Sequence, residues 1–507
     1  MRSTKPYNGI FFPRDSAHAG HLSIAGADTL LNLASKERWN ASLGEYRDIH
    51  GTLADGRKAS LLECIGAGNI DHRWGEDARY ESNFFPHYVV LGEQFVASSD
   101  ASIRALHYHF ENVDCLVHGH GTFQALSPKP DEVRRILEAE HLRGEKIAKE
   151  HGWNIQPFDP QIGEHPHLLY YSGVWEFVRF ETEIATVTMN NRTTHGPGSS
   201  KGIGIENEIS VSLVFSEPNT VHAAINSLMT LHSLYELSLG RRQRYLWIEL
   251  ELVEPGFDPE GRQLDNLELF WSYCNERVEG ETEKTHIGDV LISPDMQPEE
   301  FAVVASGWVN SAPTMSASRA RFGTAFHSTY SVDRIVGAAN MFDLLPEERA
   351  PKRKEADIET KAAVEQGKRI FKALPDSFAK QSVLSALGRV GTASLRDKVL
   401  HRAEILSAAN GNLFPDIYVP CSQAVLCRNH YVHGSDPEFD YREEFGAFAF
   451  LTNTLEFVFA TSDLIDLGWD FEKWRAKGLG SSHDFGMYVY NYAENLARLK
   501  VVLDRSA

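Results

Sequence analysis

Residues 427–434 read CRNHYVHG and set three reactive side chains at the end of an expected helix. Arg428 is a fixed cation that can neutralise a phosphate. His433 can take up or release a proton near neutral pH. Asn429 stands beside the arginine, and Gly434 is the residue type that most often ends a helix. This combination is suited to cutting RNA by acid–base chemistry without a metal ion.

Helical geometry predicts how these side chains meet. Asn429 and His433 are four residues apart and share a helix face. Arg428 lies about 140° around the helix from His433, so only a long side chain bridges the two. The last turn favours a protonated imidazole through the helix dipole, and this is the form of a general acid. The alternative is that Arg428 and His433 only finish the helix and pair with Asp436 or Glu438.

The spacing Arg-x4-His is a weak signal, because about one or two matches are expected by chance in such a chain. Three occur, at 104–109, 396–401 and 428–433. The first lies in an expected strand without a neighbouring amide. The second lies within a helix whose many charges are typical of a solvated face. The third has an apolar lead-in, Ala424–Leu426, and an asparagine after the arginine, so it is the candidate site.

Helical patterns follow one another through residues 315–507, with almost no strand signal between them. The expected helices are Tyr330–Leu345, Lys361–Ala373, Ser377–Gly388, Ser394–Ala409, Pro420–His433, Tyr441–Asp466 and Asp484–Asp504. Short loops between such helices are typical of a helical bundle. We therefore expect residues 315–507 to form an all-α domain.

Residues 1–310 have a different pattern, in which alternating and β-branched runs end at Gly, Pro, Asn or Asp. One such run is Leu168–Glu181, and two helices, Pro130–Gly152 and Asn219–Gly240, interrupt the strands. Glu276–Glu283 and Ile292–Glu300 resemble surface loops. The chain as a whole is therefore predicted to be an α+β multidomain protein whose first domain, 1–310, is β-rich and sandwich-like.

Length and composition agree with a soluble protein of two or three domains, at 507 residues, 42% apolar and 24% charged. No run approaches the roughly 20 apolar residues that span a bilayer, and the N-terminus does not resemble a signal peptide. We expect a cytoplasmic protein without membrane partners. The five cysteines are scattered and odd in number, which favours reduced thiols.

The net charge of −20 is unevenly distributed. Residues 1–310 hold 26 Lys and Arg against 45 Asp and Glu, whereas the rest of the chain holds 24 against 25. An acidic surface repels phosphates, so if either part binds RNA, it is the second. Its local basic clusters are Arg319 with Arg321, Lys352–Lys354, and Lys368 with Arg369.

A second constellation of reactive residues comprises His107, His109, Cys115, His118 and His120. Two strands of a hairpin would place the histidines of each pair on one face, where they could bind zinc. The other interpretation is an ordinary strand pair with polar outer positions. The sequence does not decide between them.

The chain resembles the HEPN superfamily in the octapeptide, in the helices around it and in its place near the C-terminus. The hallmark of that superfamily is an arginine followed by a polar residue, any three residues and a histidine. With the upstream helix Tyr330–Leu345, the chain looks most similar to ApeA-type HEPN proteins. The resemblance implies a β-rich N-terminal domain, a C-terminal HEPN bundle and no cofactor. It also implies that two copies of the motif face each other in a homodimer or higher homo-oligomer.

The resemblance further implies a metal-independent endoribonuclease. Arg428 would hold the scissile phosphate, Asn429 would orient the phosphate or the histidine, and His433 would transfer a proton. The substrate's own 2′-hydroxyl would then be the nucleophile. Asp343, in the first bundle helix, is a supporting candidate that points either into the cleft or to solvent.

ApeA-like proteins act in bacterial antiphage defence, by abortive infection. The resemblance therefore implies a host RNA such as tRNA as the substrate and a phage-derived trigger. The N-terminal domain would sense that trigger or restrain the nuclease. The alternative is a module that binds a phage protein or a glycan, with a HEPN bundle that only dimerises or binds nucleotides.

Overall fold

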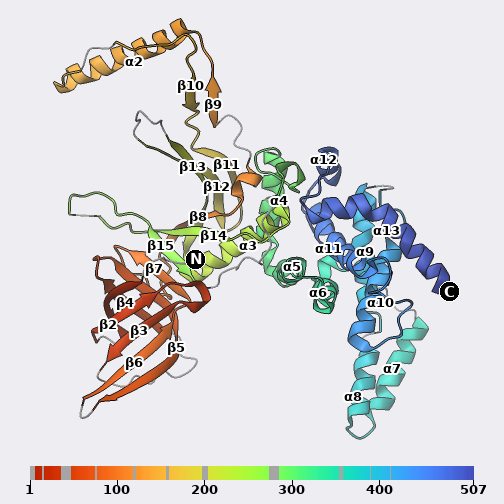
Figure 1. Cartoon of the computed structure of the whole chain (residues 1–507). Coiled ribbons are helices and arrows are strands. Elements are labelled where there is room, and N and C mark those ends of the chain that lie inside the picture. Colours follow the sequence, from red (N-terminus) through yellow and green to blue (C-terminus); the bar gives the residue numbers. More distant parts are fainter. Residues whose placement is uncertain are drawn as a thin grey trace.

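The protein is an elongated molecule with a sheet-rich part at one end and a helical part at the other (Figure 1). The computed structural model describes residues 6–13, 16–35, 47–74, 77–117, 122–155, 159–196, 204–257, 259–272, 285–352, 358–388, 390–410 and 413–506. Among the features predicted above, His118, His120, Cys274, Glu276–Glu283 and the pair Arg353–Lys354 lie outside these residues.

Thirteen described strands form one antiparallel sheet in the order β11-β12-β13-β8-β14-β15-β7-β5-β4-β1-β2-β3-β6. They are β1 (Tyr7–Phe12), β2 (His18–Ser23), β3 (Leu30–Ser35), β4 (Arg47–Leu53), β5 (Lys58–Trp74), β6 (Asp77–Phe85), β7 (Tyr88–Gly92), β8 (Ile103–Phe110), β11 (Glu176–Glu181), β12 (Ala185–His195), β13 (Ile205–Asn219), β14 (Tyr245–Leu252) and β15 (Leu267–Trp271). The predicted β-rich first part is therefore confirmed.

The last six strands of this order close into a barrel, because β5 and β6 also pair with each other. Residues 58–62 of β5 pair with β7, and residues 65–74 pair with β6, with a register shift between Gly66 and Gly68. Gly68 has a φ of 111°, which glycine adopts at little cost. A separate apolar cluster, including Phe11, Leu22 and Ile49, fills the barrel. The alternating pattern does not distinguish this closed sheet from the sandwich-like arrangement that we expected.

The described helices number thirteen. They are α1 (Val113–Leu116), α2 (Pro130–His151), α3 (Val221–Leu239), α4 (Pro298–Asn310), α5 (Ala312–Phe326), α6 (Val332–Asp343), α7 (Ile358–Lys372), α8 (Phe378–Gly388), α9 (Leu395–Asn410), α10 (Tyr418–His433), α11 (Ala447–Asp466), α12 (Phe471–Ala476) and α13 (Asp484–Ser506). Every helix that the sequence predicted is present, with ends shifted by a few residues. None of the described helices is long and apolar enough to cross a membrane.

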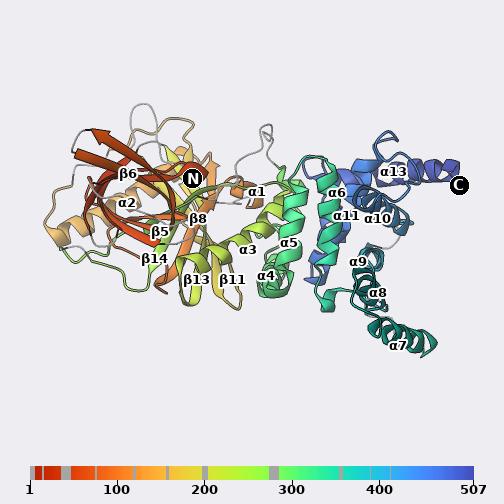
Figure 2. The same ribbon diagram turned by 90° about the horizontal axis from the view of Figure 1, so that it is seen from below.

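Helix α3 joins the sheet-rich part to the helices, packing against β8 and β13 on one side and against α4 and α5 on the other (Figure 2). It begins at Thr220, whose hydroxyl accepts a hydrogen bond from the Ala223 N–H, and it ends at Gly240 in the left-handed conformation. One apolar cluster continues from the sheet through α3 into the bundle. The two parts therefore share a core.

The predicted surface loop over Ile292–Glu300 is wrong. Ile292 is fully buried, and α4 begins at Pro298, because proline is well tolerated in the first turn of a helix. The preceding Asp289 accepts hydrogen bonds from the Gly480 and Ser482 N–H groups at 2.6 and 2.9 Å. These hydrogen bonds attach the segment that precedes α4 to the loop between α12 and α13.

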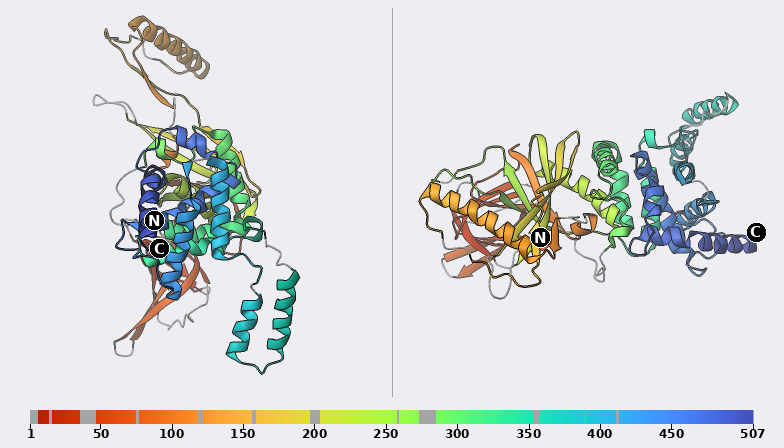
Figure 3. Two further views of the ribbon diagram at one scale, coloured as in Figure 1. Left: turned by 90° about the vertical axis from the view of Figure 1, so that its right-hand side faces the viewer. Right: turned by 90° about the horizontal axis from the view of Figure 1, so that it is seen from above.

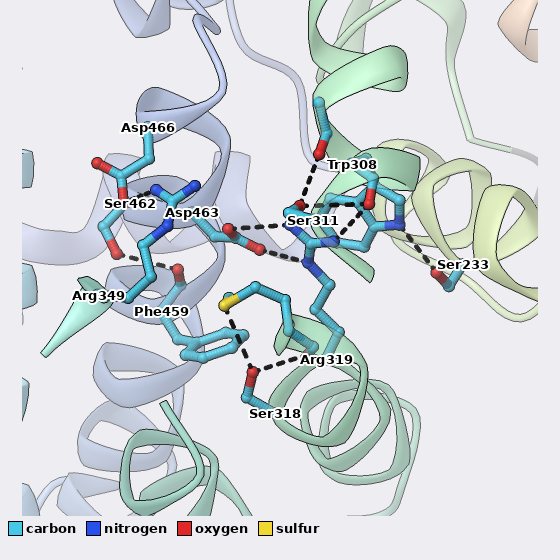
Figure 4. A network of polar contacts seen from close by, with 12 residues as sticks. Ser233, Trp308, Ser311, Ser318, Arg319, Arg349, Phe459, Ser462, Asp463 and Asp466 are labelled. Atoms are coloured by element: carbon cyan, nitrogen blue, oxygen red, sulfur yellow. Dashed lines mark hydrogen bonds and ion pairs between the residues drawn. The ribbon is translucent and has the colours of Figure 1, made fainter. Parts of the chain in front are cut away.

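Helix α11 lies at the centre of the bundle and carries three acidic side chains that pair with buried arginines of other helices. Arg319 of α5 binds Asp463, Arg334 of α6 binds Glu456, and Arg402 of α9 binds Asp466. Figure 4 shows the first of these pairs, together with Asp466 and its second partner Arg349. Because Arg319 is only 6% exposed, its expected role in an RNA-binding surface is wrong.

Two segments project from the body of the molecule (Figure 3). One comprises β9 (Phe123–Leu126), β10 (Leu168–Tyr171) and the charged helix α2. The expected strand Leu168–Glu181 is thus divided, since β10 pairs with β9 whereas β11 joins the large sheet. The other segment is the α7–α8 hairpin, in which the described side chains are not buried.

Candidate active site

Helix α10 carries the candidate residues at its C-terminal end and packs against α6, α9 and α11. Its inner face, including Cys421, Ala424 and Cys427, is buried. Burial raises the pKa of the Cys427 thiol to about 12, so this thiol stays protonated and is a poor nucleophile. Gly434 ends the helix with a φ of 69° and donates its N–H to the His430 carbonyl. This cap fixes where the reactive side chains leave the helix.

The structure brings Arg428, Asn429 and His433 together. One terminal nitrogen of the Arg428 guanidinium lies 3.1 Å from Asn429 Oδ1 and 3.0 Å from His433 Nε2. Arg428 and Asn429 are half-buried, whereas His433 is exposed. The expected reach of the arginine around the helix is therefore observed, and the three side chains form one cluster at the surface.

The contact also bears on the chemistry of His433. A guanidinium can only donate hydrogen bonds, so His433 Nε2 is the acceptor in this contact. The imidazole in this arrangement is suited to accept a proton.

Asn340 of α6 is a fourth member of the cluster that sequence reasoning missed. Its Oδ1 accepts a hydrogen bond of 3.2 Å from the second terminal nitrogen of Arg428. Asp343, the supporting candidate, lies one turn later, where its side chain is 45% exposed and 3.6 Å from Lys398 Nζ. In the structure the residue of α6 that contacts the Arg428 guanidinium is therefore Asn340, and Asp343 lies near Lys398. The available signal was a polar residue in the otherwise apolar stretch 337–342 of this helix.

Arg428 differs from the other arginines of the bundle. Arg319, Arg334 and Arg402 each bind a carboxylate. In contrast, no carboxylate of the described residues lies within ion-pair distance of Arg428. Its hydrogen-bond partners there are neutral, and its buried Nε has none. The alternative pairing with Glu438 is not observed, since that carboxylate accepts a hydrogen bond from Gln423. The positive charge of Arg428 is thus left uncompensated.

The other two Arg-x4-His matches do not form such a cluster in the part of the chain that the structure describes. Arg104 pairs with Glu251 on the neighbouring strand β14. Arg396 contacts the Ser422 hydroxyl, and His401 lies 3.6 Å from Glu404. The third match is set apart by contact between its own two side chains.

The proposed zinc hairpin is only partly described. His107 and His109 lie on β8, where one ring nitrogen of each is bonded, to the Ser212 hydroxyl and the Ile209 carbonyl respectively. Cys115 is buried in the short helix α1. No group of three or more His, Cys, Asp or Glu side chains among the described residues is arranged to hold a metal ion.

If the cluster cleaves RNA, as expected from the sequence, Asn340→Ala should lower the rate of cleavage about fivefold, the equivalent of about 1 kcal/mol for one lost hydrogen bond. The Arg428 guanidinium would lose the contact that restrains it from α6. Initial cleavage rates of the purified variants measure the effect. Asp343→Ala, changed on the same helix, is the control and should stay within twofold of wild type. Equal rates for all three proteins would contradict a positioning role for Asn340.

Two family models match the chain. The model described as ApeA N-terminal domain 1 matches residues 6–308, and the model described as Apea-like HEPN matches residues 336–473. The second range contains Asn340 and the cluster on α10. No curated protein and no solved structure matches the chain.

The helical part is thus a HEPN domain, the class of bundle expected from the motif and its surroundings. The N-terminal family model covers more than half of the chain, so the chain belongs to the ApeA family. HEPN domains are associated with nucleases, and the two domains together indicate a nuclease-type role in antiviral defence.

Proposed function

We propose that this protein is a metal-independent endoribonuclease of bacterial antiphage defence that cuts a host RNA, with tRNA as a candidate, during abortive infection. The observation that carries the proposal is the Arg428 guanidinium, which has no carboxylate partner among the described residues and lies 3.0 Å from His433 Nε2 at the protein surface. A phosphate would supply the missing negative charge. A structural arginine would be expected to bind a carboxylate, as Arg319 and Arg334 do.

In the proposed reaction, Arg428 holds the phosphate and stabilises the charge that develops on it. The incoming phosphate draws the guanidinium away from His433, which frees Nε2 to accept the proton of the 2′-hydroxyl. The 2′-oxygen forms a bond to phosphorus while the bond to the 5′-oxygen breaks. That 5′-oxygen takes up a proton from water or from the His433 of a second copy. The products are a 2′,3′-cyclic phosphate and a 5′-hydroxyl.

The wider setting of this activity is part of the same proposal. We propose that the chain divides into domains 1–310 and 315–507 and that the first domain senses a phage-derived trigger or restrains the nuclease. The second domain would pair with a second copy, so that two clusters form one cleft. The protein would act in the cytoplasm without a cofactor or a membrane partner.

A substrate comparison tests the reaction. We expect the full-length protein to cut a single-stranded RNA oligonucleotide in the presence of EDTA and to leave a 2′-deoxy oligonucleotide of the same sequence intact. The 2′-deoxy oligonucleotide lacks the hydroxyl that acts as the nucleophile. EDTA removes only metal ions, which the proposed reaction does not use. Gel electrophoresis and end-group analysis measure both outcomes. Cleavage of the deoxy substrate, or loss of all cleavage in EDTA, would refute the proposal. RNA that is bound and left uncut would favour the non-catalytic alternative.

A further inference from the structure

A cavity of about 420 Å³ lies between the sheet-rich part and helix α5, away from the cluster on α10. Its walls come from α3, the strands β14 and β15, the end of α4 and one face of α5. This volume lies within the range of small-molecule sites, which often form where two parts of a protein meet. The cavity is therefore large enough for a ligand the size of a mononucleotide.

One wall of the cavity is aromatic. The rings of Tyr245 and Trp271 lie with their centroids 6.1 Å apart. Trp308 is fixed on another side, because its indole N–H lies 3.0 Å from the Thr230 carbonyl. The same N–H lies 3.1 Å from the Ser233 hydroxyl (Figure 4). Flat rings pack well against such a wall.

One end of the cavity is lined by the cation Arg242 and by His327, the residue that directly follows α5. Arg242 lines the cavity near this histidine, and no carboxylate of the described residues lies within ion-pair distance of its guanidinium. Burial lowers the pKa of His327, and so do the nearby cations Arg242 and Arg334. The imidazole therefore stays neutral while the cavity is empty. An anion placed between the two side chains would gain a charge-assisted hydrogen bond from the arginine.

Two further charged side chains line the cavity, and each has a partner. The Glu236 carboxylate accepts a hydrogen bond from the Gln243 N–H, and Arg319 pairs with Asp463. The remaining polar groups are neutral. The Asn226 amide on α3 and the Ser316 and Thr324 hydroxyls on α5 border the same space. These side chains can donate and accept hydrogen bonds, as sugar hydroxyls require. A charged end, an aromatic wall and hydroxyl partners are thus present in one cavity.

We propose that this cavity binds a small anion carrying a flat ring, of the nucleoside monophosphate class, with its phosphate at Arg242 and its ring against Tyr245 and Trp271. Such a ligand would contact the sheet-rich part and α5 at once and so hold the two together. The proposal is independent of RNA cleavage, because none of its residues belongs to the cluster on α10.

Titration calorimetry of the full-length protein with adenosine monophosphate tests the proposal. We expect a Kd on the order of 10–100 μM, the range for a ligand of this size. Adenosine and inorganic phosphate are each expected to bind at least tenfold more weakly, because each lacks one half of the recognised group. No saturable binding of the nucleotide, or equal binding of either fragment, would overturn the proposal.

Two variants locate the binding in this cavity. Arg242→Gln removes the cation and should weaken binding at least tenfold, and Thr324→Trp should block binding by filling the cavity from an exposed position on α5. Arg143→Gln, on the projecting helix α2, is the matched control and should bind as wild type. Each variant is first shown to unfold at the wild-type temperature. Wild-type affinity in both cavity variants would overturn the assignment.

Discussion

Arg428→Ala is expected to lower the rate of RNA cleavage by a factor on the order of 100 or more, and His433→Ala by a similar factor. The first change removes the cation that stabilises the developing charge. The second removes the group that accepts the 2′-hydroxyl proton. Initial rates on a defined RNA, measured with the full-length proteins at equal concentration, give both factors. Loss in each variant would show that the two side chains act in one reaction.

The chain offers a matched control for this pair. Arg396 and His401 have the same spacing on α9 but do not contact each other, so replacing either by alanine should leave the rate within twofold of wild type. Arg428→Lys adds a test of geometry, because lysine keeps the charge and loses the planar fork that reaches both His433 and Asn340. We expect the cleavage rate of this variant to be at least tenfold lower than that of wild type. Cleavage at the wild-type rate by Arg428→Ala would rule out the proposed site.

Folding should not explain these losses. His433 is exposed and Arg428 is half-buried with neutral partners, so both variants should unfold within about 1 kcal/mol of the wild-type free energy. Thermal or urea denaturation of each variant, followed by circular dichroism, checks this expectation.

The cluster on α10 was largely predictable because its three members lie within one and a half turns of a single helix. Their contacts depend on helical geometry, which residue spacing specifies. Asn340 was not predictable in the same way, since 88 positions separate it from Arg428. Only the packing of α6 against α10 brings the two together. The contact itself is therefore a result of the tertiary fold.

Local pattern also explains which parts of the fold were anticipated. Helices with clear caps, such as α3 with Thr220 and Gly240, were predicted from the sequence and are observed. Helix α5 was not, because its small and polar residues do not form a strong apolar stripe. The closure of the barrel depends on β5 pairing with β6 across a bulge. Strand patterns specify faces but not partners, so this closure had no local signal.

Arg319 shows why a basic cluster in the sequence is ambiguous. Its spacing from Arg321 is typical of a solvated, phosphate-binding surface. In the structure it is buried, and it binds an aspartate 144 positions away. A buried arginine requires such a partner, but the sequence does not indicate which acidic residue supplies it.

Arg319→Met is expected to destabilise the protein by about 3–5 kcal/mol. The guanidinium donates hydrogen bonds of 2.8 and 3.2 Å to Asp463 and one of 2.7 Å to the Trp308 carbonyl. It also lies 3.8 Å over the Trp308 ring (Figure 4). Removing it leaves the Asp463 carboxylate, whose side chain is 1% exposed, without its charged partner. Urea denaturation followed by tryptophan fluorescence measures the change.

The double variant Arg319→Met with Asp463→Leu separates the cost of an unpaired charge from the loss of packing. With both charges replaced by apolar groups, most of the lost free energy should return, because no buried carboxylate remains to be desolvated. Arg321→Met, two residues along α5 and without an ion pair among the described residues, should change the stability by less than about 1 kcal/mol. A double variant as unstable as Arg319→Met would mean that the arginine stabilises the junction through Trp308 and the end of α4. The pair with Asp463 would then contribute little to joining α5 to the centre of the bundle.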